Sequence, residues 1–156
     1  MPLVPLEALF ASLAPNARLL GLDVGKKTVG LALSDVRRMV ASPMETIARS
    51  KLVADIERIR TIVAAQSVGG FVVGLPISMD GTEGPRCQSV RQFAADLARA
   101  IDLPLAFFDE RLSTAAVERL LIDEADMSRK RRDEVIDKMA AAYILQGALD
   151  RTAARR

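Results

Sequence analysis

Histidine is absent from this chain of 156 residues, and cysteine occurs once, at Cys87. Without histidine, neither a serine–histidine nor a cysteine–histidine hydrolase site can be assembled, because the usual general base at neutral pH is missing. A single cysteine forms no internal disulfide, and without histidine it leaves no ligand set for structural zinc. Acid–base or metal chemistry must therefore use carboxylates, and we expect a cytoplasmic protein whose metal ions, if any, are held by oxygen atoms.

Long apolar runs and a strong net charge are also lacking. No stretch of about 18 uncharged apolar residues occurs, so we expect no membrane span or anchor. Residues 1–16 carry Glu7 and three prolines behind a start without basic residues, which predicts an accessory turn or short helix and not a signal peptide. The 22 basic and 20 acidic residues give a net charge of +2, so a nucleic acid partner would need a local basic cluster.

The patterns that are present predict one α/β domain over residues 17–156, preceded by an extension over residues 1–16. Strand-like runs occupy 18–25 and 28–35, which form an antiparallel hairpin, and then 42–48, 69–76 and 103–110. Helical patterns occupy 52–66, 88–101, 115–122 and 134–150, and the first of these has Leu52, Ile56, Ile59 and Val63 at three- and four-residue steps. Because helical crossovers pack back onto the strands they connect, this order predicts a mixed sheet with helices on both faces.

Two acids are predicted at the carboxyl ends of strands, where ligand sites of such folds lie. Asp23 sits within a core strand, where a carboxylate is costly unless it is paired or holds a cation; the alternative is an aspartate that caps the hairpin turn. Of the adjacent acids Asp109 and Glu110, only one can face inward. We assign Glu110 to that role and leave Asp109 as an accessory or helix-entry acid. The alternative for Glu110 is helix capping, for which Ser113 and Thr114 are better suited.

A third acid, Asp137, lies on the last predicted helix. Its neighbours at three, four and seven residues are Ala140, Ala141 and Ile144, a stripe that should pack on the sheet. The alternative is an exposed aspartate paired with a nearby base. Asp23, Glu110 and Asp137 at one sheet edge would form an oxygen-only site suited to Mg²⁺ or Mn²⁺. Such ions can activate water in phosphodiester cleavage.

Four ordered motifs, which together span about residues 18–150, closely resemble the YqgF family of RuvC-like nucleases for pre-16S ribosomal RNA. They read LLGLDVGKKTVGLALSD, VVGLPISMDGTEGP, FFDERLST and RKRRDEVIDKMAAAYILQ. The resemblance implies a ribonuclease H-like mixed five-stranded sheet, divalent-metal nuclease activity and a role in maturing the 5′ end of small-subunit ribosomal RNA. It also implies that Asp23, Glu110 and Asp137 match the family's three acidic positions.

Basic residues near the predicted site are candidates for nucleic-acid binding. Lys26 in the hairpin turn could approach a phosphate or be a solvated lysine, and Arg86 follows a glycine-rich loop whose amides could cradle one. Arg111 could bind nucleic acid or pair with Asp109. A run of four bases, predicted to lie in a charged loop before the last helix, could contact several phosphates; its members are Arg129, Lys130, Arg131 and Arg132.

The sequence leaves several functions open. The leading one is a metal-dependent endonuclease acting on structured RNA, and the alternatives are a Holliday-junction DNA resolvase acting on branched DNA and a non-catalytic nucleic-acid-binding module. An actin-like ATPase is disfavoured, since that fold needs two such domains and this chain has room for one. The protein is expected to be a monomer or a homodimer.

Overall fold

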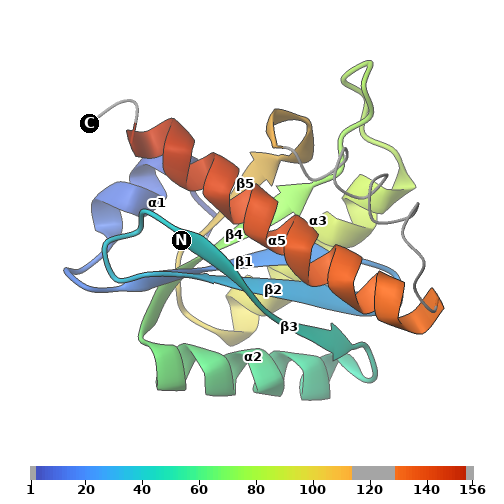
Figure 1. Ribbon diagram of the computed structural model, residues 1–156, viewed down its shortest axis with the longest axis horizontal. Coiled ribbons are helices and arrows are strands. Elements are labelled where there is room, and N and C mark those ends of the chain that lie inside the picture. Colours follow the sequence, from blue (N-terminus) through green and yellow to red (C-terminus); the bar gives the residue numbers. More distant parts are fainter. Residues whose placement is uncertain (1–2, 114–128, 154–156) are drawn as a thin grey trace.

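Five strands form one mixed sheet in the computed structural model, which describes residues 3–113 and 129–153 (Figure 1). The strands are β1 (Arg18–Val24), β2 (Thr28–Ser34), β3 (Ala41–Ala48), β4 (Val68–Leu75) and β5 (Leu105–Asp109). Their order is β3-β2-β1-β4-β5, with β1–β2 and β2–β3 antiparallel and β1–β4 and β4–β5 parallel. The expected hairpin, third strand and mixed five-stranded sheet are confirmed.

Alternate residues of β1 face opposite sides of the sheet. Leu20, Leu22 and Val24 belong to the core beneath two helices, α2 (Leu52–Gln66) and α3 (Pro85–Ala100). Gly21 faces the other side, where a Cβ at this position would lie 2.8 Å from the Cβ of Leu145 in α5 (Arg129–Ala153). By the same alternation, Asp23 faces α5.

The predicted helix over 52–66 matches α2, but its buried face differs from the expected one. Ile56 and Ile59 are buried as expected, whereas Leu52 is 39% exposed. Asp55 is buried instead, because its carboxylate accepts hydrogen bonds from the backbone N–H and the hydroxyl of Ser50. At the start of the helix, a polar side chain held by a local hydrogen bond is therefore buried, and the apolar residue expected there is exposed.

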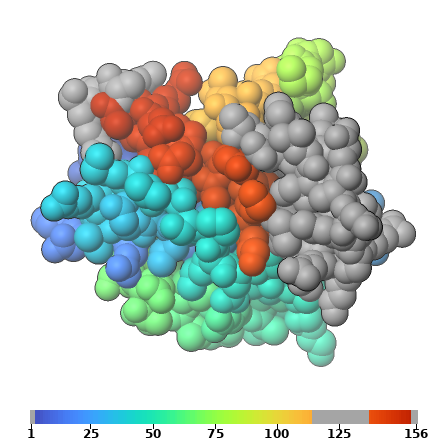
Figure 2. All heavy atoms as spheres, viewed as in Figure 1, coloured from blue at the N-terminus to red at the C-terminus, as the bar shows by residue number. Residues whose placement is uncertain are grey.

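The opposite face of the sheet is covered by α5 and by a short helix, α1 (Leu6–Ser12). Helix α5 crosses in front of β1 and β2 and runs beside β3 (Figure 1), and it packs against all three strands. In the space-filling view α5 lies directly against the residues around β3 (Figure 2). Leu9 of α1 is fully buried beside α5, and the backbone N–H of Val4 donates to the carbonyl of Leu105 in β5 at 2.9 Å. Residues 3–12 of the extension thus pack into a second hydrophobic core, which lies between the sheet and helices α1 and α5.

Two of the boundaries that differ from those predicted bear on the site. Strand β5 ends at Asp109, and Glu110 begins a 3-10 turn, η1 (Glu110–Leu112), because the Asp109 carboxylate accepts the N–H of Arg111 and caps it. Helix α5 begins at Arg129, five residues before the predicted start at 134. The basic run 129–132 therefore lies in the first turn of a helix and not in a loop. The helix predicted over 115–122, including the possible cap Thr114, lies outside the described residues.

Candidate active site

Asp23 is buried beneath the N-terminal half of α5, with 3% of its surface exposed. Its partner in the antiparallel register is Gly30 of β2, and directly opposed residues project to the same face. A Cβ at Gly30 would lie 2.0 Å from the carbonyl oxygen of Asp137 and 2.8 Å from the nitrogen of Lys138. The glycine therefore lets the α5 backbone descend onto the sheet beside Asp23.

The direction of α5 places Asp137 at the end of the sheet where β1 finishes. A Cβ at Gly21 would lie 3.1 Å from the carbonyl oxygen of Ala141, one helical turn after Asp137. Moving from Gly21 to Asp23 along β1 therefore corresponds to moving from Ala141 back to Asp137 along α5. Strand and helix run antiparallel, and the helix N-terminus lies at the carboxyl end of β1.

The Asp137 side chain is held by Thr28, the first residue of β2. The Thr28 hydroxyl donates to Oδ2 of Asp137. Thr28 lies two residues before Gly30, so it is on the α5 face and is a diagonal neighbour of Asp23. The two aspartates, 114 positions apart in the chain, thus share one face and one end of the sheet.

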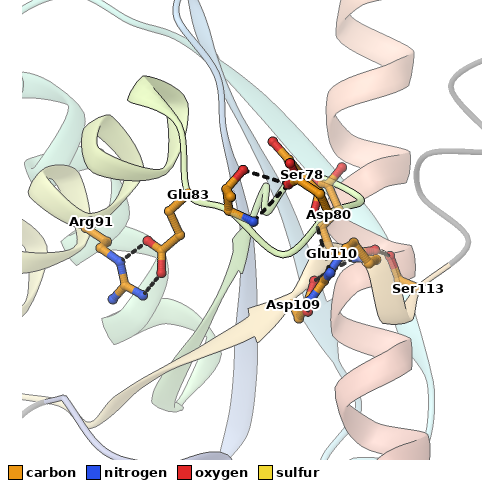
Figure 3. Close-up of polar contacts among 9 residues, drawn as sticks. Ser78, Asp80, Glu83, Arg91, Asp109, Glu110 and Ser113 are labelled. Atoms are coloured by element: carbon orange, nitrogen blue, oxygen red, sulfur yellow. Dashed lines mark hydrogen bonds and ion pairs between the residues drawn. The ribbon is translucent and has the colours of Figure 1, made fainter.

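Glu110 occupies the same end of the sheet, two strands away from Asp23. It is 6% exposed, whereas its neighbour Asp109 is accessible and is engaged by Arg111. Of the two adjacent acids, Glu110 is thus the inward one, as expected. It reaches that position from the first residue of a 3-10 turn and not from the strand. Figure 3 shows both acids at the end of β5, next to the loop that carries Ser78 and Asp80.

The Arg111 guanidinium binds the Asp109 carboxylate and the carbonyl of Ser78. Its Nη2 lies 2.7 Å from Oδ2 of Asp109, its Nε also donates to that carboxylate, and its Nη1 donates to the carbonyl of Ser78 at 3.4 Å. The hydrogen-bonded guanidinium holds the pKa of Asp109 below its usual value, despite partial burial that acts in the opposite direction. Of the two roles open to Arg111, the structure displays the pairing with Asp109, and the residue ties the loop after β4 to the end of β5.

The glycine-rich loop 76–84 is closed by its own hydrogen bonds. The N–H of Ser78 donates to Thr82 O, that of Gly81 to Ser78 O, and that of Thr82 to the carboxylate of Asp80. The hydrogen bonds from Thr82 lower the pKa of Asp80, so this closing carboxylate stays ionised. Three of the amides expected to cradle a phosphate are therefore occupied within the loop.

The three carboxylates do not form one cluster in this structure. Within the part of the chain that the structure describes, no group of three or more Asp, Glu, Cys or His side chains is placed to hold a metal ion. Asp23 and Asp137 lie at the same crossing of β1, β2 and α5, while Glu110 is separated from them by β4. The geometry brings two of the three predicted ligands together and places the third at the same edge.

The other predicted basic residues form two groups. Lys26 and Arg86 are exposed and line one hollow between the β1–β2 turn and α3. The run that comprises Arg129, Lys130, Arg131 and Arg132 begins α5, and its first member is about 12 Å along the helix axis from Asp137. The side chains of this run lie outside the described residues.

Three residues that position the site were not predicted. Gly30 and Thr28 set the approach and orientation of Asp137, and Arg49 donates from Nη1 to the carbonyl of Gly25 at 2.7 Å, which fixes the hairpin turn. The alternation of β2 places Thr28 and Gly30 on the same face as Asp23, and that signal was available in the sequence. Their partner on α5 was not.

This chain is similar to known proteins along nearly its whole length. The family model described as "RuvX: Holliday junction resolvase" matches residues 17–151. A relative from Paramagnetospirillum magneticum is 63% identical over 96% of both chains, and one from Phenylobacterium zucineum is 55% identical over 97% of both. Each is named "Putative pre-16S rRNA nuclease".

Solved structures share the fold at low sequence identity. Thermus thermophilus RuvC in complex with a Holliday junction substrate superimposes with a TM-score of 0.52 at 13% identity, covering 86% of this chain and 95% of RuvC. The yeast mitochondrial Holliday junction resolvase Ydc2 gives 0.53 at 14%, covering 95% and 84%. None of the described helices combines the length and apolarity needed to cross a bilayer. Because the family model and close relatives match along nearly the whole chain, this protein belongs to the RuvX family, which is the YqgF family that its four motifs resemble.

Proposed function

We propose that this protein is a divalent-metal-dependent endonuclease that hydrolyses phosphodiester bonds in the 5′-end maturation of pre-16S ribosomal RNA in the cytoplasm. The observation that carries the proposal is the pair Asp23 and Asp137, brought to one sheet end by Gly30 in a chain without histidine. A buried carboxylate beside a second acid is costly unless a cation or a proton balances it. The names of relatives up to 63% identical support the nuclease activity and its ribosomal substrate.

The donor atoms fit Mg²⁺ or Mn²⁺. Both ions prefer oxygen ligands, and Mg²⁺ is commonly bound through one or two carboxylates, with water and substrate phosphates completing its shell. Asp23 and Asp137 would hold the metal, and Glu110 would join when the substrate is in place. When bound, such an ion lowers the pKa of a water molecule and stabilises charge on the phosphoryl oxygens.

The protein's own residues have distinct roles in this proposal. Thr28 fixes the rotamer of Asp137 through its hydroxyl, and burial under α5 limits the access of water to Asp23. Lys26 and Arg86, together with the basic run 129–132, would attract and hold the phosphate backbone without reading bases. Arg111 acts through Asp109 and the loop 76–84, so we assign it a positioning role.

A Holliday-junction resolvase is the second candidate, because the family model carries that description. The likeness to RuvC, at 13% identity, concerns the fold alone. The relatives with more than half of their residues identical are named for pre-16S RNA, so the RNA substrate is favoured. A non-catalytic binding module is disfavoured, since buried carboxylates next to phosphates would only weaken binding.

Cleavage assays with purified protein test the proposal. The substrates are a ribosomal precursor RNA that contains the 5′ leader and a four-way DNA junction, each with Mg²⁺, with Mn²⁺ and with EDTA. We expect cleavage of the RNA that requires metal and is lost in Asp23→Asn and Asp137→Asn. The exposed Asp102→Asn, at the opposite end of the sheet, is the matched control and should cleave like the wild type. Cleavage by Asp23→Asn at the wild-type rate, or cleavage that EDTA does not affect, would overturn the assignment.

A further inference from the structure

A hollow of about 250 Å³ opens between the β1–β2 turn and the first two turns of α3. Its walls are turn residues 24–26 and, from α3, Pro85, Arg86, Ser89 and Val90. Two of these residues are cations and none is an acid. We call this site the turn–α3 hollow.

The charge of the hollow is unbalanced in a protein that is nearly neutral overall. A second hollow, between α2 and α3, is lined by two bases and two acids, namely Arg60, Arg99, Glu57 and Asp96. A third is lined by one of each, Arg18 and Asp35. Neither Lys26 nor Arg86 forms an ion pair with any residue in the described part of the chain. The nearby acid Glu83 is engaged by Arg91. The hollow therefore presents positive charge that a bound anion could neutralise.

The walls of the hollow are held in place before any ligand arrives. Arg49 donates from Nη1 to the carbonyl of Gly25 at 2.7 Å and from its backbone N–H to that of Lys27 at 2.8 Å. The Arg49 guanidinium also lies over the ring of Phe93 in α3, 5.2 Å from its centroid. The turn is thus braced against the helix that forms the other wall, and a pre-organised site loses less entropy on binding.

The hollow and Asp23 share one end of the sheet but open on opposite faces. Asp23 faces α5, and the next residue, Val24, faces α3 and lines the hollow. A nucleic acid strand that passes over the carboxyl end of β1 would therefore run from the carboxylates on one face to the hollow on the other. The basic run opens α5, the helix that packs on the carboxylate face of the sheet.

We propose that the turn–α3 hollow binds a backbone phosphate of the nucleic acid strand, separate from the phosphate that is cut, through Lys26, Arg86 and the Ser89 hydroxyl. This inference rests on the proposed nuclease function and adds the path of the substrate strand across the end of the sheet. Because the ligand is a phosphodiester and not a base, the site acts on RNA of any sequence.

The number of phosphates held by the two cations gives a sharp test. The slope of log K against log salt falls by about 0.7–0.9 for each phosphate that the protein no longer neutralises. If Lys26 and Arg86 hold one phosphate between them, the slope for the double variant should fall by about one such unit in total. A fall of about twice that amount would mean that each cation holds a phosphate of its own, and it would overturn the single shared phosphate.

Binding is measured by fluorescence anisotropy in the Asp23→Asn background, so that the labelled RNA is not cut. Lys26→Gln, Arg86→Gln and the double variant are compared with Lys27→Gln, an adjacent exposed lysine that does not line the hollow. We expect each single hollow variant to bind RNA about tenfold more weakly and Lys27→Gln to bind like the wild type. In the double variant, the slope of log K against log salt should be smaller by about 0.7–0.9. Equal melting midpoints establish that the exposed substitutions leave the fold intact.

Three other results would also overturn the proposal. The first is unchanged RNA binding in the double variant, and the second is an equal loss of affinity in Lys27→Gln, which would indicate a general charge effect. The third is micromolar binding of inorganic phosphate or a mononucleotide, abolished in the double variant while RNA binding is kept, which would make the hollow a small-molecule site. Failure of the nuclease proposal is distinguishable, because it appears as absent cleavage by the wild type whatever the binding slopes. When Asp23 is intact and the protein cleaves RNA, the hollow variants should raise KM, because they weaken binding of the substrate strand.

Discussion

Replacing Gly30 by alanine tests the feature on which the site depends, the close approach of α5 to the sheet. The added Cβ would lie 2.0 Å from the carbonyl oxygen and 2.2 Å from the carbonyl carbon of Asp137. These are backbone atoms of a long helix, so no side-chain rotation relieves the overlap. Helix α5 must move away by more than about 1 Å to restore ordinary contact, which is about 3.5 Å for such atoms.

The expected cost is large because the displacement affects packing and chemistry together. Overfilling a packed core typically costs about 1–3 kcal/mol, and a backbone overlap belongs at the upper end of that range. For a chain of this size, 3 kcal/mol corresponds to a fall in Tm of about 6–12 °C. Moving the Asp137 backbone by about 1 Å also separates the two aspartates, and displacements of that size can lower kcat about 100-fold.

The assay compares three glycine-to-alanine variants by thermal unfolding and by cleavage in Mn²⁺. At Gly84 an added Cβ meets nothing within 4 Å, and at Gly147 it meets the edge of the Phe108 ring at 2.9 Å, a side chain that can move. We expect Tm and cleavage to be close to the wild type for Gly84→Ala, moderately reduced for Gly147→Ala and lowest for Gly30→Ala. If Gly30→Ala melts within about 1 °C of the wild type, far less than the fall expected from overfilling, and cleaves normally, the close approach does not hold the site together.

Three further predictions concern side chains. Thr28→Val removes the hydroxyl that donates to Asp137, so kcat should fall by about tenfold with little change in Tm, while Thr28→Ser should retain activity; equal rates in both would refute the positioning role. Arg111→Met should lower the free energy of unfolding only slightly at pH 7, because the ion pair is partly exposed. The folded-state pKa of Asp109 is lowered, so urea titrations should show this difference present above the ordinary value of 3.8 and lost as the pH falls below it; a difference that grows in acid would contradict the pairing. Leu9→Ala should cost about 2–5 kcal/mol in urea unfolding, and a cost below about 0.5 kcal/mol would show that α1 is not part of the core.

Much of the fold followed from local patterns. The alternation in β1, the three- and four-residue steps in α2 and the glycine and proline boundaries each predict one element from its own residues. That only one of the adjacent acids Asp109 and Glu110 faces the core was also predictable from strand alternation. Alternation does not choose between them, and the structure shows that the buried one is Glu110, in a 3-10 turn. The start of α5 could not be predicted, because a charged run has no apolar periodicity. The pattern over 129–132 therefore predicts a loop where the structure has a helix.

The candidate site was only half accessible from sequence. Absent histidine and an aspartate in a core strand point to carboxylate chemistry, whatever the tertiary structure. The loop 76–84 shows the limit: its composition suggested open amides, and the structure closes several of them with Thr82 and Asp80. Composition shows how many backbone amides a loop contains, but it does not show which of them form hydrogen bonds within the loop.

The sequence by itself determined the order of the elements, the face to which each strand residue projects and the exclusion of imidazole and thiol chemistry, because these depend on residue type and on spacings of two to four positions. Only the tertiary structure decided that Asp137 lies against Gly30, that Arg111 serves Asp109 and Ser78, and that Lys26 and Arg86 share one hollow. Contacts between segments far apart in the chain depend on the crossing of a helix over a twisted sheet. That crossing is set by the packing of the whole core, and it cannot be inferred from the spacing of residues within one helix or strand.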